Sequence, residues 1–302
     1  MYELVKDWPQ LSNGYALGNP TGISIDSNQN IFVFIRAGRL WTEPMPDSFI
    51  SEKTILMLDR HSGKILNSWG ANLFIMPHGL SVDKNNNIWV TDVGLHQIFK
   101  FNHNGELLMK LGEANVAGND STHFNLPTDI AIAADGSFYV SDGYGNSRVV
   151  KFSSTGKYLF AWGKKGNQPG EFNLPHGIDL DAKGNVYVAD RENSRIQEFD
   201  ADGKFLKEWS SKSFGKMYSL AFDKTKGNLI AVDYIDNDTK PKGSDIILFD
   251  SIKNQATQFG RSGMYNGPVC EYHGVAIDDE ESIYVGDILG NRIQKFKKVS
   301  LH

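Results

Sequence analysis

The segment PHGIDLDAKGNVYVADRENSRIQEFDADGKFLKEW, residues 175–209, contains four short apolar or alternating runs. Alternation of apolar and polar residues with a period of two is typical of β-strands. Glycine-containing turns separate the paired runs, as in Asp-Ala-Lys-Gly at 181–184 and Asp-Ala-Asp-Gly at 200–203, and such turns favour hairpins. The segment therefore predicts a meander of four antiparallel strands.

The first half of this pattern occurs six times along the chain. Each copy has a strand that starts after a small or polar residue, a polar turn and a second apolar strand. The copies are PTGISIDSNQNIFVFIR (20–36), PHGLSVDKNNNIWVTDV (77–93), PTDIAIAADGSFYVSDG (127–143), PHGIDLDAKGNVYVADR (175–191), MYSLAFDKTKGNLIAVDY (217–234) and YHGVAIDDEESIYVGDI (272–288). Helical periodicity is nearly absent, so the pattern predicts an all-β fold.

Repeats of roughly 40 to 55 residues with four strands each match the blades of a β-propeller. The last repeat stops after its third strand, QKFKK (294–298), whereas the chain begins with YELVKDW (2–8), which resembles the fourth-strand segment KFLKEW (204–209). We therefore expect the N-terminal strand to complete the last blade and close the ring, which removes exposed sheet edges. The prediction is one six-bladed β-propeller domain that spans residues 1–302.

Composition narrows the classes of partner and location. The net charge is -5, and Lys and Arg form no cluster with aromatic residues, so nucleic acid is not an expected partner. Cys270 is the only cysteine, which excludes an internal disulfide. No run of about 18 apolar residues indicates a membrane span. No signal peptide is apparent, so the chain is expected to be cytoplasmic, or extracytoplasmic after removal of a signal peptide. A propeller of this size is expected to work as a monomer.

Three of the eight histidines occupy one frame of the repeat, directly before the first strand. This frame is expected to face the central channel, and its residues are Thr21, His78, Thr128, His176, Tyr218 and His273. Because six blades are spaced by about 60°, the three imidazoles would lie about 120° apart and point at the axis. One histidine here would be interpreted as a hydrogen-bonded channel residue, whereas three in alternating repeats predict a metal site.

Three imidazoles with an open fourth position are the ligand set of a catalytic zinc ion. The same donors also bind other divalent metals. His61, His96, His103, His123 and His302 lie outside this frame, and we expect them on the surface or in loops.

A second frame follows the aspartate at the end of the second strand. It holds arginine in the first and fourth repeats, Arg36 and Arg191, which would face each other across the ring. Two such cations predict the capture of an anionic substrate, in particular a carboxylate. Tyr144 comes one residue later in the third repeat, and a phenol beside a metal and two arginines is expected to have a lowered pKa and to act as a base.

Arginine and tyrosine at these positions also have interpretations without a catalytic or binding role. An arginine at this frame can be a solvated rim charge or an ion pair, and a tyrosine in a glycine-rich turn can be surface decoration. Arg148, Arg195 and Arg292 follow asparagine or Asn-Ser in the repeats, and we expect them to pair with strand-end aspartates between blades. Three long loops, 37–53, 115–125 and 235–244, are expected at the rims around a pocket.

Several motifs carry a resemblance that covers essentially the whole chain. They are RAGRLW (36–41), MPHGLSVD (76–83), IWVTDVGLHQIFKF (88–101), PTDIAI (127–132), VSDGYGNSR (140–148), PHGIDL (175–180), VADRENSRIQ (188–197) and YHGVAI (272–277). The units resemble NHL repeats, and the order of motifs resembles that of the peptidyl-α-hydroxyglycine α-amidating lyases. Those enzymes split an N-acylated α-hydroxyglycine into a carboxamide and glyoxylate.

By this resemblance, His78, His176 and His273 would bind zinc, and Arg36 and Arg191 would bind the substrate. Tyr144 would be catalytic. The frames of the repeat had selected the same six positions.

Two features depart from the family pattern. The family's structural calcium uses a carboxylate directly after the third zinc histidine, and this chain has Gly274 there. Calcium is therefore doubtful, although the carbonyls of Ile23 and Leu80 remain available. The family's disulfides are also missing. These departures suggest a divergent relative whose substrate need not be a peptide.

The predicted function is a zinc-dependent carbon–nitrogen lyase for an N-substituted α-hydroxyglycine. The substrate would be a peptide or a small molecule with a carboxylate, and ureidoglycolate, which would release urea and glyoxylate, also fits. The alternatives are a metal-dependent propeller hydrolase for lactones or esters and a non-enzymatic NHL scaffold. Hydrolases of this kind usually hold a hard cation with carboxylates, whereas the inward positions here offer imidazoles.

Overall fold

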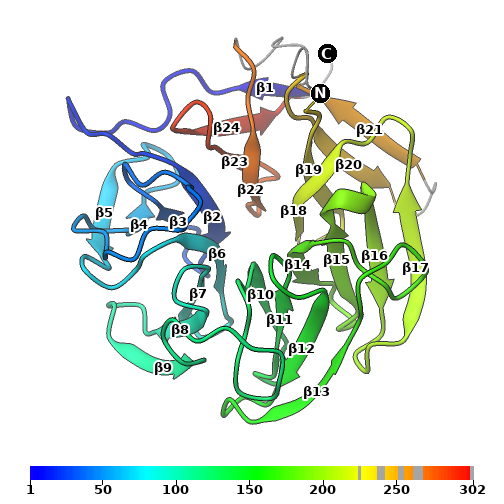
Figure 1. Cartoon of the computed structure of the whole chain (residues 1–302). Helices are drawn as coiled ribbons and strands as arrows, with labels where there is room; N and C mark the ends of the chain where they lie inside the picture. The colour runs from blue at the N-terminus through cyan, green and yellow to red at the C-terminus, as the bar shows by residue number, and fades with distance from the viewer. Residues whose placement is uncertain (224–225, 237–241, 251–254, 261–267, 300–302) are drawn as a thin grey trace.

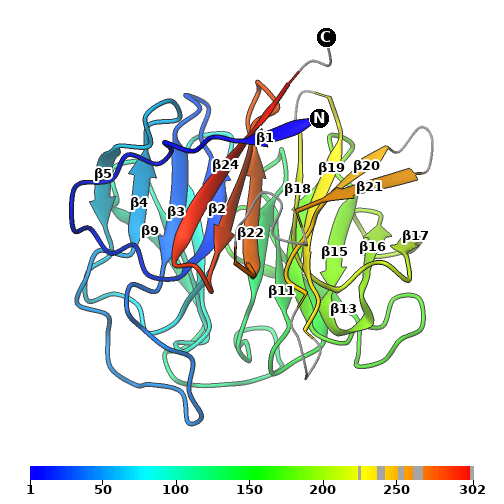
Figure 2. The same ribbon diagram turned by 90° about the horizontal axis from the view of Figure 1, so that it is seen from above.

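The computed structural model describes residues 1–223, 226–236, 242–250, 255–260 and 268–299. Within these residues, six four-stranded antiparallel sheets form a ring around a central channel (Figure 1). A view turned by 90° shows the ring from its side (Figure 2). The only helical element in the described part is a single 3₁₀ turn, Arg191–Asn193. The predicted six-bladed β-propeller is confirmed.

In five blades the strands follow chain order from the channel outward, and in the sixth β22, β23 and β24 are followed by β1. The innermost strands are β2 (Pro20–Ile25), β6 (Pro77–Val82), β10 (Asp129–Ile132), β14 (Pro175–Leu180), β18 (Lys216–Phe222) and β22 (Tyr272–Ile277). The second strands are β3 (Ile31–Ile35), β7 (Ile88–Asp92), β11 (Phe138–Asp142), β15 (Val186–Asp190), β19 (Leu229–Tyr234) and β23 (Ile283–Asp287).

The outer strands complete the blades, which we number 1 to 6 from β2. The third strands are β4 (Ile55–Leu58), β8 (Gln97–Phe101), β12 (Arg148–Phe152), β16 (Arg195–Phe199), β20 (Ile246–Asp250) and β24 (Arg292–Lys298). The fourth strands are β5 (Ile65–Trp69), β9 (Leu107–Leu111), β13 (Tyr158–Trp162), β17 (Phe205–Ser210), β21 (Gln255–Phe259) and, in blade 6, β1 (Tyr2–Leu4).

The N-terminal strand closes the ring as predicted. β1 pairs antiparallel with β24, with Tyr2 opposite Lys298 and Leu4 opposite Phe296. It is shorter than the predicted segment 2–8, because the chain turns at residues 6–7. Blade 6 therefore takes its outermost strand from the start of the chain and its other three from the end.

Burial follows the position of a strand within its blade. Every residue of β3, β7, β11, β15, β19 and β23 is buried, whereas β17 alternates between half-buried and exposed residues. A second strand has a neighbouring blade on both faces, so most of its side chains are apolar, and polar ones such as Thr91 and Asp142 are buried too. The outermost strand has solvent on one side, and in blades 1 to 5 it contains only half-buried and exposed residues.

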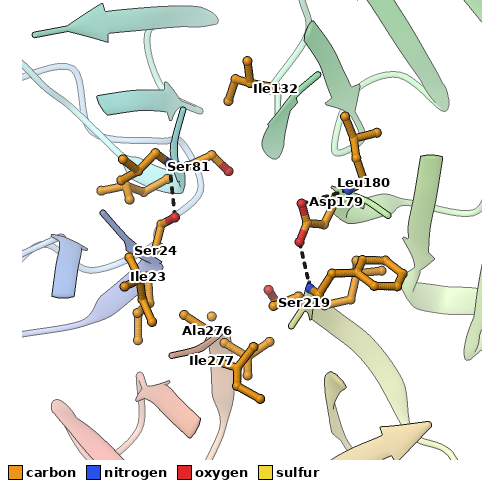
Figure 3. Close-up of a pocket in the computed structure, with 18 of the residues that line it drawn as sticks. Ile23, Ser24, Ser81, Ile132, Asp179, Leu180, Ser219, Ala276 and Ile277 are labelled. Atoms are coloured by element: carbon orange, nitrogen blue, oxygen red, sulfur yellow. Dashed lines mark hydrogen bonds between the residues drawn. The ribbon is translucent and has the colours of Figure 1, made fainter. Parts of the chain in front are cut away.

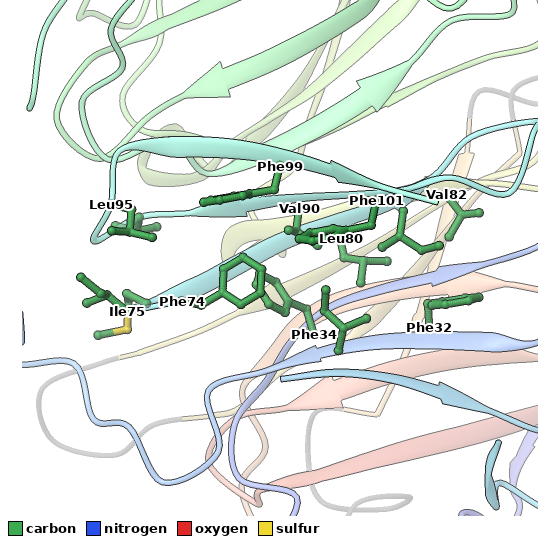
Figure 4. Close-up of a cluster of buried hydrophobic side chains, with 14 residues drawn as sticks. Phe32, Phe34, Phe74, Ile75, Leu80, Val82, Val90, Leu95, Phe99 and Phe101 are labelled. Atoms are coloured by element: carbon green, nitrogen blue, oxygen red, sulfur yellow. The ribbon is translucent and has the colours of Figure 1, made fainter. Parts of the chain in front are cut away.

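The blades are joined by aromatic and aliphatic side chains packed between their faces. Between blades 1 and 2, Phe34 contacts Phe74 edge to face at 4.9 Å between ring centroids, and Phe74 contacts Phe99 at 5.2 Å (Figure 4). Burial of each such ring contributes about 1.5–3 kcal/mol. The packing fixes the angle between adjacent blades and so the radius of the channel.

An irregularity in register marks the start of five innermost strands. The shift falls at Pro20/Gly22, Pro77/Leu80, Pro175/Gly177, Met217/Ser219 and Tyr272/Gly274. A bulge bends a strand and re-aims one side chain. In four of these strands the skipped residue is the channel residue, and in β6 the skipped pair contains it, so the frame identified in the sequence is a structural frame.

Candidate active site

Three histidines meet on the channel axis. His78, His176 and His273 are the second residues of β6, β14 and β22, in alternating blades. Their ring centroids are 4.5, 4.6 and 4.8 Å apart, and one nitrogen from each ring lies within 4.8 Å of the others. All three are buried. The ring thus brings together residues that are about 100 positions apart in sequence.

Each imidazole is oriented by a backbone carbonyl of the next blade. The Nδ1 atom of His78 lies 2.6 Å from the carbonyl oxygen of Thr128, and the corresponding contacts of His176 with Tyr218 and of His273 with Thr21 are 2.6 and 2.8 Å. A carbonyl oxygen can only accept, so Nδ1 carries the proton. A neutral ring then keeps a lone pair on Nε2, which is the arrangement of metal-binding histidines.

The glycine after each histidine permits this contact. A Cβ atom on Gly177 would lie 2.9 Å from the Cα of Ser219 and 3.0 Å from the carbonyl oxygen of Tyr218, and one on Gly274 would lie 2.7 Å from the carbonyl oxygen of Thr21. Any side chain here would push away the carbonyl that orients the imidazole. The recurrent His-Gly pair therefore has a steric cause.

The electrostatics of the three histidines suit a metal. Burial and the neighbouring positive groups lower the pKa values of His78 and His176 well below the usual range, and burial and Arg36 lower the pKa of His273 to about 3. All three are therefore neutral near pH 7, as metal ligands must be. Three buried, neutral and convergent imidazoles fit a divalent metal such as zinc.

Tyr144 lies on the face of this triad. Its hydroxyl oxygen is 3.1 Å from Nε2 of His78 and 3.0 Å from Nε2 of His176. Burial raises the pKa of Tyr144 and outweighs the lowering effects of Arg191 and Arg36. The two arginines act in the direction expected from sequence, but without a metal ion the effect of burial is larger and the pKa of Tyr144 is raised.

Both predicted arginines lie beside the triad. Arg36 follows β3 and donates from Nε to the carbonyl oxygen of Pro77 at 2.9 Å, while its buried Nη2 has no hydrogen-bond partner. Nη1 of Arg191 lies 3.5 Å from the hydroxyl of Tyr144, and its guanidinium carbon lies 4.6 Å from the ring centroid of Tyr218. A buried donor without a partner is costly, so the Nη2 atom of Arg36 indicates a site for an anionic ligand.

Glu271 is a half-buried acidic residue at this site that the repeat pattern did not predict. It accepts a hydrogen bond from the hydroxyl of Tyr218 at 2.8 Å. Burial raises its pKa, against the effects of Tyr218, Arg191 and Arg36. A sequence signal for it existed: the position two residues before the channel frame holds Asn19, Met76, Leu126, Leu174, Lys216 and Glu271, and it is acidic only in blade 6.

The remaining predicted residues lie outside the triad. Arg148, Arg195 and Arg292 pair with Asp142, Asp190 and Asp287, each at the opposite strand position within the same blade. The expectation that these pairs join different blades is wrong, because the hairpin places both partners side by side. His61, His96, His103 and His123 are half-buried or exposed, and His302 lies outside the described residues.

One predicted rim loop contributes directly. Within the insertion 37–53, the ring of Trp41 lies 4.9 Å from that of Tyr144 and 5.4 Å from the guanidinium carbon of Arg36. In the loop 115–125, the carbonyl oxygen of His123 accepts from Arg148 at 2.8 Å. Half of the loop 235–244, residues 237–241, lies outside the described residues.

A cavity of about 600 Å³ occupies the channel on the other side of the triad. Figure 3 shows Ser24, Ser81, Asp179 and Ser219 around its open centre, together with apolar side chains from several blades. None of Arg36, Tyr144 or Arg191 lines it. We call the opposite side, where these three residues and Glu271 lie, the mouth.

Gly274 leaves no carboxylate at the position that the resemblance assigns to calcium. The close approach of the Thr21 carbonyl also leaves no room for a side chain there with this backbone. Among the described residues, the three histidines are the one group of three or more His, Cys, Asp or Glu side chains close enough to hold a metal ion. The structure therefore adds nothing in favour of calcium.

Comparisons with known proteins agree with the fold. The model of the NHL repeat matches residues 74–101, 124–152 and 172–199. The chain is 36% identical over 311 residues to peptidyl-glycine alpha-amidating monooxygenase B of Xenopus laevis, which covers 96% of this chain and 35% of that protein. It is 31% identical over 329 residues to peptidyl-alpha-hydroxyglycine alpha-amidating lyase 1 of Drosophila melanogaster, which covers 97% and 59%.

The match to a probable lyase of the same name from Caenorhabditis elegans is 41% identical over 198 residues and covers 61% of this chain and 56% of that protein. The chain thus spans only part of the length of these curated relatives. Among solved structures, a streptogramin B lyase has a TM-score of 0.60 at 16% identity and covers 100% of this chain and 88% of that one. A gluconolactonase from Xanthomonas campestris has a TM-score of 0.63 at 14% identity and covers 94% and 87%.

These structural matches show the fold alone. No helix in the described residues is long and apolar enough to cross a bilayer.

Proposed function

Because this chain is an NHL-repeat six-bladed propeller and a homologue of the peptidyl-α-hydroxyglycine α-amidating lyases, we propose that it is a metal-dependent carbon–nitrogen lyase. Its substrate is an N-substituted α-hydroxyglycine, and its products are an amide and glyoxylate. The observation that carries this proposal is the meeting of three neutral imidazoles with Tyr144 on their Nε2 face and Arg191 within 3.5 Å of the phenol.

His78, His176 and His273 would hold the metal, and zinc suits three nitrogen ligands with one open position. When bound, such an ion acts as a Lewis acid that favours loss of a proton from an alcohol. The chain itself supplies the rest: an oriented set of nitrogen donors and the groups that hold the substrate.

Arg36 and Arg191 bind the substrate carboxylate. They belong to blades 1 and 4, which lie opposite each other in a six-bladed ring, so the carboxylate can receive hydrogen bonds from both sides. The unpartnered Nη2 of Arg36 gains a partner in this complex. Fixing the carboxylate also places the adjacent α-carbon over the triad, which lowers the entropic cost of the reaction.

Tyr144 moves the proton. In its phenolate form, which Arg191, Arg36 and a bound metal ion would favour against the effect of burial, its oxygen accepts the proton of the substrate hydroxyl as the carbon–oxygen double bond of glyoxylate forms and the carbon–nitrogen bond breaks. The electron pair of that bond leaves with nitrogen, and the proton ends on nitrogen to give the amide. No oxidant or reductant is required.

The substituent on the scissile nitrogen can belong to either predicted class of substrate, a peptide or a small molecule such as ureidoglycolate. The ring of Trp41 borders the mouth on blade 1. It offers apolar contact to whatever follows the scissile nitrogen.

Metal analysis and product detection test this proposal together. Protein prepared without chelator is expected to contain about one zinc ion per chain and to release glyoxylate from a panel of N-substituted α-hydroxyglycines. His176→Ala is expected to lose the metal, whereas His61→Ala, which changes an exposed histidine, keeps it. Full metal content in His176→Ala would exclude this residue as a ligand.

The same panel separates the alternatives. Ester or lactone cleavage without glyoxylate release would indicate the hydrolase, and a protein without metal or turnover would indicate the scaffold. Either result would overturn the lyase assignment.

A further inference from the structure

Glu271 has a fixed place in the mouth. It precedes β22 by one residue and His273 by two. Its backbone N–H donates to Oδ1 of Asp287 at 3.0 Å, and its carbonyl oxygen accepts from the N–H of Ile288 at 3.0 Å. These contacts tie Glu271 to the end of β23, where the corresponding frame of blade 1 holds Arg36.

The side chain of Glu271 is held by one oxygen only. Oε1 accepts from the hydroxyl of Tyr218 at 2.8 Å, and the ring of Tyr218 also lies under the guanidinium of Arg191. The carbonyl of Tyr218 in turn orients His176. No residue in the described part of the chain donates to Oε2, and neither Arg36 nor Arg191 forms an ion pair with Glu271. The free oxygen is available to a ligand.

The four polar residues of the mouth come from two pairs of opposite blades. Arg36 and Arg191 belong to blades 1 and 4, while Tyr144 and Glu271 belong to blades 3 and 6. Blades three apart lie on opposite sides of a six-bladed ring. One line across the mouth therefore joins two cations, and the other joins a phenol and a carboxylate.

The α-carbon of an α-hydroxyglycine carries three polar substituents: a carboxylate, a hydroxyl and a nitrogen. Each of them can be matched to one of the protein groups on these two lines. The carboxylate goes to the arginines, and the hydroxyl goes to Tyr144 and the triad. The nitrogen is left on the side opposite Tyr144, which is the side of Glu271. Its N–H is a donor, and the free carboxylate oxygen is an acceptor.

We propose that Glu271 binds the substrate by accepting a hydrogen bond from the N–H of the scissile carbon–nitrogen bond. This inference rests on the proposed lyase function and extends it to the substrate class: the enzyme takes secondary amides and ureides and discriminates against substrates whose nitrogen carries no hydrogen.

The test compares N-benzoyl-α-hydroxyglycine with its N-methyl analogue, with glyoxylate release as the readout. A hydrogen bond to a charged group is worth about 1.5–3 kcal/mol, so the wild type is expected to prefer the N–H substrate by at least tenfold in kcat/KM. Glu271→Leu is expected to lose most of this preference. Glu271→Gln keeps part of it, because the amide oxygen can still accept.

Glu281→Gln is the matched control. Glu281 is an acidic residue of the same blade, and it pairs with Lys226 and Lys298. Its replacement is expected to leave the preference unchanged. Metal content and circular dichroism show whether each variant folds, and Glu271→Gln keeps the test informative if Glu271→Leu does not.

Failure of the lyase proposal and failure of the Glu271 proposal give different results in this experiment. A wild type that releases glyoxylate from neither these compounds nor the wider panel overturns the lyase function and this inference with it. An active wild type that shows no preference, or a preference that is as large in Glu271→Leu as in the wild type, overturns the role of Glu271 alone.

Discussion

At the residue scale, the candidate site depends on how a few polar side chains are held. Each histidine has its Nδ1 proton fixed by a carbonyl, so the chemistry is left to Nε2. Tyr144 contacts two of these nitrogens and is itself covered by the ring of Trp41. A phenol in that place is well positioned to exchange a proton with a ligand on the triad.

Tyr144→Phe is expected to keep the metal and to lose turnover. Loss of a general base typically costs a factor of about 10²–10⁴ in rate, whereas the three imidazoles are unchanged. The measurements are kcat for glyoxylate release and the zinc content of the purified variant. Unchanged turnover would remove Tyr144 from the mechanism.

At the element scale, the irregular register at the start of the innermost strands positions the channel residues. The bulge turns the channel residue toward the axis, and the following glycine lets the next blade approach. Asp129 occupies the glycine position in blade 3 and shows a second use of it. Its carboxylate accepts from the N–H groups of Ile130 and Ile178 and so joins blades 3 and 4.

Gly177→Ala is expected to weaken both stability and metal binding. The added methyl would meet the backbone of Ser219 and Tyr218, and relief of such a clash typically costs about 1–3 kcal/mol. Urea unfolding measures the first effect, and a zinc titration measures the second.

Gly38→Ala is the control, because a Cβ there meets no atom within 4 Å. Equal stability and zinc affinity in the wild type and Gly177→Ala would show that the innermost strands do not need this close approach.

At the scale of the whole molecule, the site exists only when the ring is closed. Its residues come from all six blades, and blade 6 is completed by β1. The N-terminal segment is held further by Trp8, which is 5% exposed and contacts Tyr284 at 5.1 Å between ring centroids. Contacts between the first and last parts of the chain therefore maintain the geometry of the triad.

Trp8→Ala is expected to lower the free energy of unfolding by about 3–5 kcal/mol, the usual cost of removing a buried tryptophan. Trp41→Ala serves as the comparison, because Trp41 is 36% exposed and its loss should cost much less stability. Chemical denaturation of the two variants gives the difference. Similar stability of both would contradict a structural role for Trp8 in closing the ring.

The sequence by itself determined the fold, the order of the blades and six of the site positions, because these follow from a local repeat. Period-two alternation specifies strands, and a fixed frame specifies which residue faces the channel, so His78, Arg36 and Tyr144 could be selected before any contact was known. The pairing of Arg148 with Asp142 of the same blade could be recognised only from the hairpin geometry.

Only the tertiary structure decided the electrostatics of the site and the place of Glu271. The burial that raises the pKa of Tyr144 depends on side chains from other blades, and the anchor of Glu271 is Tyr218, 53 positions away. Glu271 is the only acidic residue among the corresponding positions of the six repeats. The repeat pattern therefore gave no reason to select it. Packing between distant segments sets burial and partnership, and these are not encoded in any local pattern.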